Sequence, residues 1–145
     1  MASVPVRICD LGGWTDTWFG GPGRVVNSAV TPGVEVAVHA SAGSDPVTLR
    51  LAATGERYAV VPGAARTARN PLVEAAVDVF APPRDVAIEV RIRSEVPAGC
   101  GACTSAAVAV ALVGAGAALR GEEWSPRDGA YAARQLEVGV LGMES

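Results

Sequence analysis

The chain of 145 residues contains no lysine, a single histidine and three cysteines, and these shortages exclude several kinds of site. The Walker A phosphate loop needs a lysine directly before its serine or threonine, so that nucleotide motif is excluded. A structural zinc site needs four ligands, but Cys100 and Cys103 have no second CxxC pair, and His39 falls on the polar phase of a predicted strand. We therefore predict buried or loop-lining thiols rather than metal-thiolate chemistry.

The chain also lacks a strong charge of one sign and a long apolar run. Its 12 basic residues, all arginine, face 15 acidic ones, and no basic stripe indicates nucleic-acid binding. The first residues do not form a secretory signal, and the Ala/Val run at 106–119 contains two glycines and is too short to span a bilayer. With 50% hydrophobic residues the composition is typical of a globular protein. We expect a cytoplasmic protein with no nucleic-acid or membrane partner.

The hydrophobic pattern predicts one α+β domain without linkers or repeats. Alternation of period two, bounded by turn residues, predicts extended segments at 4–11, 24–31, 34–39, 47–53, 57–61 and 85–96. Helical spacing predicts helices from the Asn70-Pro71 start to the prolines at 82–83, at 104–119, and from the cap Ser125 onward. The helix at 104–119 is apolar nearly all round, so we expect it to be buried.

Small residues join the strand at 85–96 to the helix at 104–119, and this junction is the most informative part of the sequence. Gly99 and Gly101 can take positive φ, so that backbone N–H groups converge on an anion. The helix beginning at Thr104 adds unsatisfied first-turn donors and the positive end of its dipole. The junction predicts a phosphate-binding loop; the alternative is that small residues only let a strand and a helix pack closely.

This loop resembles the second motif of the GHMP kinases (galactokinase, homoserine kinase, mevalonate kinase and phosphomevalonate kinase), which reads roughly PxGxGLGSSSA. The matching residues are Pro97, Gly99, Gly101, Ser105 and Ala106, with Thr104 at the first serine. Cys103 stands at the third glycine and would be strained by about 1–2 kcal/mol if that position is left-handed. The resemblance implies that ATP phosphates bind to Pro97, Gly99, Cys100, Gly101, Ala102, Cys103, Thr104 and Ser105.

The segment 5–17 resembles the first motif of the same family, PxRxxLxGxxTD, and precedes the loop in the family's order and separation. Its Gly-Gly-Trp-Thr-Asp form is closer to fucokinase and heptose-7-phosphate kinase relatives than to galactokinase. The resemblance implies that Arg7 lies beside the reacting hydroxyl, where it would stabilise transferring charge. The implied substrate-binding residues are Gly13, Trp14, Thr15 and Asp16, with Asp16 gripping sugar hydroxyls. A surface ion pair for Arg7 and a turn cap for Asp16 are the alternatives.

The last residues, 135–145, resemble the approach to a third motif, GxxSGxxD, whose Asp is catalytic in the family. Glu137 is set back from Ser145 by the family spacing, which implies that Ser105 and Glu137 are the Mg²⁺ ligands. A helix first-turn hydroxyl and a solvated helix acid are the alternatives. We expect residues 1–145 to be the N-terminal, ATP-binding domain, truncated just before the catalytic Asp and without the C-terminal domain.

Taken as a member of this family, the chain is expected to have a ribosomal protein S5 domain 2-like fold, with a mixed or antiparallel sheet backed by helices. The implied activity is Mg²⁺-dependent transfer of the ATP γ-phosphoryl group to a hydroxyl of a sugar or sugar phosphate. One alternative is a non-catalytic or partner-dependent half-protein that binds sugar and nucleotide; another is a homoserine or mevalonate kinase. We expect the isolated chain to be inactive and to self-associate through the face left by the missing lobe.

Overall fold

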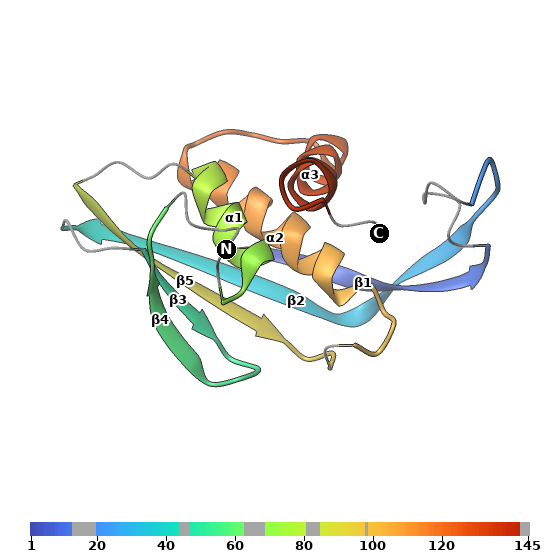
Figure 1. The fold of residues 1–145 in the computed structure, drawn as a ribbon, viewed down its shortest axis with the longest axis horizontal. Coiled ribbons are helices and arrows are strands. Elements are labelled where there is room, and N and C mark those ends of the chain that lie inside the picture. Colours follow the sequence, from blue (N-terminus) through green and yellow to red (C-terminus); the bar gives the residue numbers. More distant parts are fainter. Residues whose placement is uncertain (13–19, 44–46, 63–68, 81–84, 98, 143–145) are drawn as a thin grey trace.

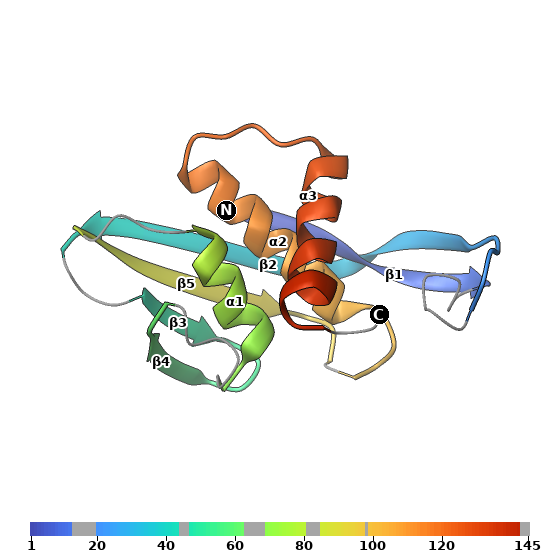
Figure 2. The same ribbon diagram turned by 45° about the horizontal axis from the view of Figure 1, so that its top comes forward.

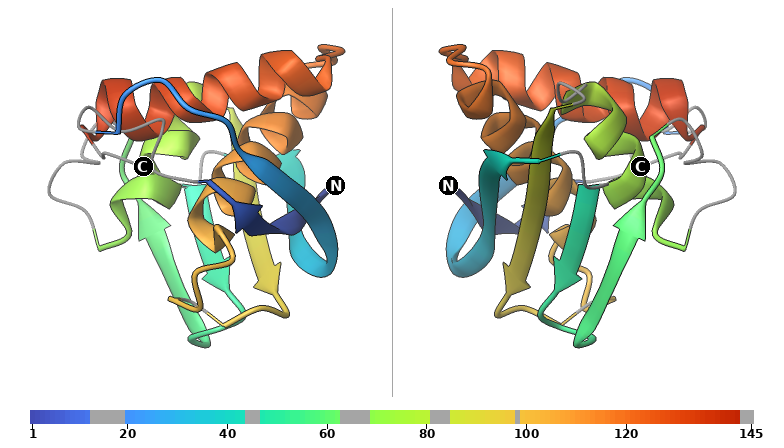
Figure 3. Two further views of the ribbon diagram at one scale, coloured as in Figure 1. Left: turned by 90° about the vertical axis from the view of Figure 1, so that its right-hand side faces the viewer. Right: turned by 90° about the vertical axis from the view of Figure 1, so that its left-hand side faces the viewer.

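A computed structural model describes residues 1–12, 20–43, 47–62, 69–80, 85–97 and 99–142. They form a five-stranded sheet with all helices on one face (Figures 1, 2 and 3). The elements in chain order are β1 (Ala2–Leu11), β2 (Val26–Ala42), β3 (Val47–Leu51), β4 (Glu56–Val60), α1 (Pro71–Phe80), β5 (Val86–Ser94), α2 (Thr104–Leu119), α3 (Pro126–Arg134) and the π-helical segment η2 (Gln135–Val140). No helix in the described ranges is long and apolar enough to cross a membrane.

The sheet is mixed, with strand order β1-β2-β5-β3-β4. The pairs β1–β2, β2–β5 and β3–β4 are antiparallel, whereas β3 and β5 are parallel because the chain crosses over through β4 and α1 between them. This arrangement confirms the predicted α+β class. β1 and the first part of β2 extend past the helices as a two-stranded arm (Figure 1).

The two extended segments predicted at 24–31 and 34–39 form one strand of 17 residues, so the prediction of two separate segments was wrong. Pro32 and Gly33 break the sequence pattern, but they lie where the pairing register with β1 shifts, between Pro5 and Val6. Such a bulge tolerates a proline, which has no N–H to donate to the ladder. A side chain at Gly33 would clash with the Val4 carbonyl oxygen, so the close approach of the strands requires glycine.

The core lies between the sheet and the helices. Side chains of β2 and β5 alternate between the two faces, and several that point toward the helices are fully or almost fully buried, among them Val34, Val36, Ile88 and Val90. One side of the helix α2 contacts β1 and β2, and its other sides contact α1 and α3. These contacts explain why its sequence is apolar nearly all round. The predictions of its bounds and of its burial are both confirmed.

The helix α3 starts at the predicted cap Ser125, which forms a capping box with Asp128. The Ser125 hydroxyl accepts from the Asp128 N–H at 3.2 Å, and Asp128 in turn accepts from the Ser125 N–H at 3.0 Å. The hydrogen bond from the Ser125 side chain, together with that from its backbone, lowers the pKa of the Asp128 carboxyl. After Arg134 the helix widens into η2, which the sequence pattern did not predict, so Glu137 lies on a π-helical segment rather than on a regular α-helix.

Candidate active site

The junction between β5 and α2 has the backbone of an anion-binding loop. The Ser94 side chain closes the end of β5, accepting from the Val96 N–H at 3.2 Å and donating to the Val96 carbonyl at 2.8 Å. Beyond it, Gly99 and Gly101 have φ of 77° and 78°. The prediction that these glycines take positive φ is confirmed. Left-handed residues of this kind point backbone N–H groups into a concave surface that can bind an anion.

Cys103 is left-handed as well, with φ 54° and ψ 39°, and it is the one non-glycine residue with positive φ in the described part of the chain. It is the N-cap residue of α2, yet its side chain makes no capping hydrogen bond. A non-glycine residue in this conformation costs about 1–2 kcal/mol. Cys103 stands at the third glycine of the motif, and its left-handed conformation there is the strained one anticipated from the sequence.

The first turn of α2 carries the polar groups that face the loop. Ser105 is exposed, whereas Thr104 Oγ1 is buried and has no hydrogen-bond partner among the described residues. A buried hydroxyl without a partner is destabilising by about 1–3 kcal/mol, unless a ligand supplies the missing bond. Together with the unpaired first-turn N–H groups of α2, this hydroxyl fits a phosphate oxygen.

A pocket of about 650 Å³ opens over this loop. Its wall combines the loop and α2 with the start of α1, and its lining residues are Asn70, Pro71, Leu72, Val73, Gly99, Gly101, Cys103, Thr104, Ser105 and Val108. No sequence pattern indicated Asn70, Leu72, Val73 and Val108 as site residues. Asn70-Pro71 was recognised as a helix start, but only the packing of α1 against α2 brings that start to the loop.

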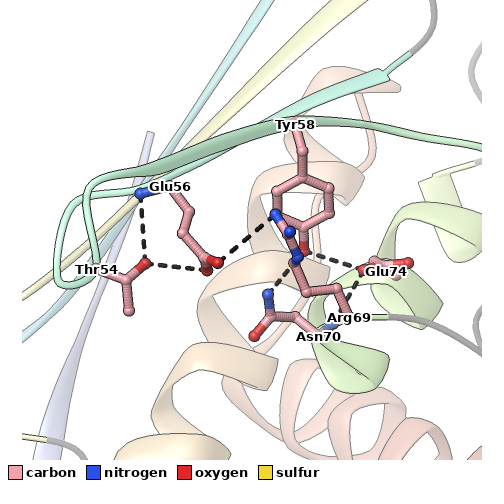
Figure 4. Close-up of polar contacts among 6 residues, drawn as sticks. All are labelled: Thr54, Glu56, Tyr58, Arg69, Asn70 and Glu74. Carbon is pink, nitrogen blue, oxygen red and sulfur yellow. Dashed lines mark hydrogen bonds and ion pairs between the residues drawn. The ribbon is translucent and has the colours of Figure 1, made fainter.

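A hydrogen-bonded network fixes the start of α1 (Figure 4). The buried Glu74 carboxylate accepts from the Tyr58 hydroxyl and from the Asn70 N–H, both at 3.0 Å, and the Asn70 side-chain amide donates to the Tyr58 oxygen at 2.8 Å. Burial raises the pKa of Tyr58, and the bond to Glu74 adds to this while that from Asn70 opposes it. Arg69 stacks on the Tyr58 ring at 5.3 Å and pairs with Glu56 at 3.6 Å. The pocket wall is thus anchored to β4.

The structure brings Arg7 of the first motif to the phosphate loop. Its backbone N–H donates to the Ala102 carbonyl at 3.2 Å, and its Nε–H donates to Cys103 Sγ at 2.9 Å. Arg7 and Cys103 are 96 positions apart in sequence. The predicted substrate-binding residues Gly13, Trp14, Thr15 and Asp16 lie outside the described residues, so their roles stay predictions.

Glu137 is only 6% exposed, and burial raises the pKa of its carboxyl. It does not belong to the described residues that line the pocket, and the described residues contain no group of three or more His, Cys, Asp or Glu side chains able to hold a metal ion. The pairing of Ser105 with Glu137 as Mg²⁺ ligands therefore stays a prediction.

A second cavity of about 410 Å³ lies over the sheet and is lined by Arg50, Arg57, Arg91 and Arg93 together with parts of β2 and the β3–β4 turn. Beside it, Glu89 pairs with Arg91, with Arg50 at 3.6 Å and with Arg57 at 3.9 Å, and the hydrogen bond from Arg91 lowers its pKa. Ion pairs between exposed side chains contribute little stability. Neither motif contributes a residue to this cavity, so we place the site at the loop.

Residues 70–145 match the model of the GHMP kinases N terminal domain. No curated protein sequence matches the chain.

Solved structures with the same fold include the mevalonate kinase of Methanococcus jannaschii (TM-score 0.73, 14% identity). They also include a D-glycero-D-manno-heptose 1-phosphate kinase from Bacteroides thetaiotaomicron (0.73, 14%) and the galactokinase of Lactococcus lactis complexed with galactose (0.71, 18%). Each covers 99% of this chain, which in turn covers 47%, 49% and 38% of those chains, so it spans about half their length or less. At these identities the structures establish the fold, and the matched domain establishes the family: the chain belongs to the GHMP kinases and carries their N-terminal domain.

Proposed function

We propose that this domain binds the nucleotide of an ATP-dependent sugar kinase. The observation that carries the proposal is the loop at 99–103, where three left-handed residues precede a helix whose first hydroxyl is buried without a partner. Each of these features favours a bound anion, and each is costly or unused without one. A chain of phosphates is the anion that a kinase must hold.

The pocket suits a nucleotide in size and in lining. Its volume of about 650 Å³ lies within the range of ordinary ligand sites, about 300–1,000 Å³. The loop and the first turn of α2 supply polar donors at one side, while Leu72, Val73 and Val108 supply an apolar wall. We therefore place the phosphates on the loop and the base against that wall.

Mg²⁺ would be held by the hydroxyl of Ser105 and the carboxylate of Glu137, and when bound it would neutralise charge on the transferred phosphoryl group. Glu137 fits this role chemically, because a buried carboxylate with a raised pKa gains most from a nearby cation. Ser105 fits because its hydroxyl is exposed beside the loop.

For the acceptor we propose a sugar or sugar phosphate. Arg7, which the structure places against the loop, would stabilise charge on the transferring phosphoryl oxygens. Asp16 would hold sugar hydroxyls, as its motif implies. We expect Asp16→Asn to raise the KM for the sugar while leaving ATP affinity within about twofold, because only the acceptor side loses a hydrogen-bonding charge.

The nucleotide assignment is tested by removing the unpartnered hydroxyl. Thr104→Val keeps the side-chain shape, so we expect nucleotide affinity to fall about tenfold by titration calorimetry, in the range expected for one hydrogen bond to a charged group. Thr48→Val, at a partly buried position on β3, is the matched control and should bind as the native protein does. If both variants bind ATP equally well, the phosphates do not lie on this loop.

The acceptor assignment is tested in the full-length protein by following ADP release with a panel of sugars, sugar phosphates, mevalonate and homoserine. We expect turnover with a sugar or sugar phosphate. Turnover only with mevalonate or homoserine would place the protein with the other branches of the family. Nucleotide and sugar binding without turnover would indicate a non-catalytic binding protein.

A further inference from the structure

The contact between Arg7 and Cys103 has no counterpart in the motif that the loop resembles, because the motif has a glycine at the position of Cys103. Arg7 Nε–H donates to Cys103 Sγ at 2.9 Å, and the Arg7 backbone N–H donates to the Ala102 carbonyl at 3.2 Å. Two consecutive loop residues therefore hold one residue of β1 through both its backbone and its side chain.

The backbone conformation of Cys103 indicates that its side chain has a specific role. With φ 54° it occupies a conformation that glycine adopts without strain, and its sulfur does not cap α2. The sulfur instead accepts the Arg7 hydrogen bond, which glycine has no atom to accept. The strained backbone is thus retained together with a contact to β1 that requires a side chain.

That contact restricts the orientation of the guanidinium. Arginine carries five N–H donors in one plane, so a hydrogen bond at Nε restricts the plane and the direction of the two terminal nitrogens. An arginine side chain loses rotamer freedom when it binds a phosphoryl group. Orienting Arg7 in advance removes this loss from the reaction.

We propose that Cys103 is a positioning residue that orients Arg7 toward the phosphoryl group held by the loop. The consequence for turnover rests on the proposed kinase function, whereas the orientation of Arg7 does not. Because the loop N–H groups that bind phosphate remain in a Cys103 variant, the effect falls on kcat rather than on the KM for ATP.

Three substitutions separate the sulfur contact from the backbone strain. Cys103→Ser keeps an acceptor, Cys103→Ala keeps the Cβ but loses the acceptor, and Cys103→Gly loses both and relieves the left-handed strain. In the full-length protein we expect Ser to retain kcat within about threefold, and Ala and Gly to lose about tenfold, with the KM for ATP within about twofold in all three. Ser41→Ala, at an exposed position near the end of β2, serves as the control and should leave kcat unchanged.

A double-mutant cycle shows whether the effect passes through Arg7. In an Arg7→Gln background, Cys103→Ala should cause no further loss of kcat, because the group that it orients is gone. A Ser variant as slow as the Ala variant, or an Ala loss that persists in the Arg7→Gln background, overturns the proposal.

A readout without catalysis keeps the two proposals apart. The Arg7 Nε–H proton, observed by ¹⁵N-edited NMR, should exchange slowly with water in the native protein and in Cys103→Ser, and about tenfold faster in Cys103→Ala. If no acceptor is phosphorylated, the kinase assignment is wrong and this pattern alone decides the role of Cys103. An exchange rate that Cys103→Ala leaves unchanged overturns the orienting contact itself.

Discussion

Glu74 and Glu137 are buried to the same degree, at 7% and 6% exposure, but their surroundings differ. Glu74 accepts hydrogen bonds from the Tyr58 hydroxyl and the Asn70 N–H at the corner between β4 and α1. The Glu137 carboxylate, on η2, has no hydrogen-bond or ion-pair partner among the described residues, and burial raises its pKa.

The difference distinguishes an acid that holds the fold from an acid whose carboxylate has no donor among the described residues. A buried carboxylate is stable when neighbours donate hydrogen bonds to it, as they do at Glu74. Without them it is costly, and such groups are found preferentially at functional sites, where a substrate or cation completes the set of contacts. Removal of these two side chains should therefore affect the free energy of unfolding differently.

The largest expected effect is on stability. Glu74→Leu leaves the partly buried Tyr58 hydroxyl and Asn70 N–H without an acceptor, so the free energy of unfolding should fall by about 3 kcal/mol. Glu137→Leu is the matched substitution and should change it little or raise it, because no bond is lost. Urea unfolding followed by circular dichroism measures both. Equal losses at the two positions would remove the distinction.

The next effect is on turnover. In the full-length protein, Glu137→Gln and Ser105→Ala should each lower kcat/KM by about tenfold or more and raise the Mg²⁺ concentration needed for half-maximal rate, because each removes an oxygen ligand. Glu123→Gln, at an exposed acid between α2 and α3, serves as the control. Unchanged rates and Mg²⁺ dependence in both variants would remove Ser105 and Glu137 from the metal site.

A smaller effect comes from one member of the Glu74 network. Tyr58→Phe removes the donor to Glu74 and the acceptor of the Asn70 amide, so we expect a loss of about 1 kcal/mol in the free energy of unfolding. Tyr131→Phe, on the exposed side of α3, should be neutral. A loss at Tyr58 as large as that of Glu74→Leu would mean that the aromatic hydroxyl, not the acid, anchors α1.

The smallest effect is the pH dependence of stability. The folded-state pKa of Glu137 lies above its ordinary value of 4.5, so the folded chain holds this proton to higher pH than the unfolded chain does. The stability contributed by Glu137 is thus present below that ordinary value and is lost as pH rises through the raised folded pKa.

The melting temperature of Glu137→Gln relative to the native protein should therefore increase from about pH 4 to about pH 7. Mg²⁺ with ATP should reduce this difference at the upper end of the range, because it stabilises the native carboxylate. A constant difference across the range would show that Glu137 does not titrate differently on folding.

Local signals in the sequence predicted local structure well. The bounds of α2, the cap of α3 at Ser125, and positive φ at two loop glycines all follow from residues close together in the chain. Strand pairing and helix packing bring Arg7 to Cys103 and the start of α1 to the pocket, and no short-range pattern encodes either. The unbroken course of β2 was missed because Pro32 and Gly33 interrupt the pattern without ending the strand.

The π-helical turn of η2 also has a consequence for how this chain tolerates insertion and deletion. Neighbouring residues are about 100° apart around an α-helix and closer together around the wider π turn, which lets Leu136 and Glu137 both be buried. A π turn is an α-helix with one residue inserted, so removing a single residue from η2 would restore the regular winding and rotate Glu137 away from its present face. We expect such a deletion to be harmful here, whereas one in the exposed turn at 52–55 should be tolerated.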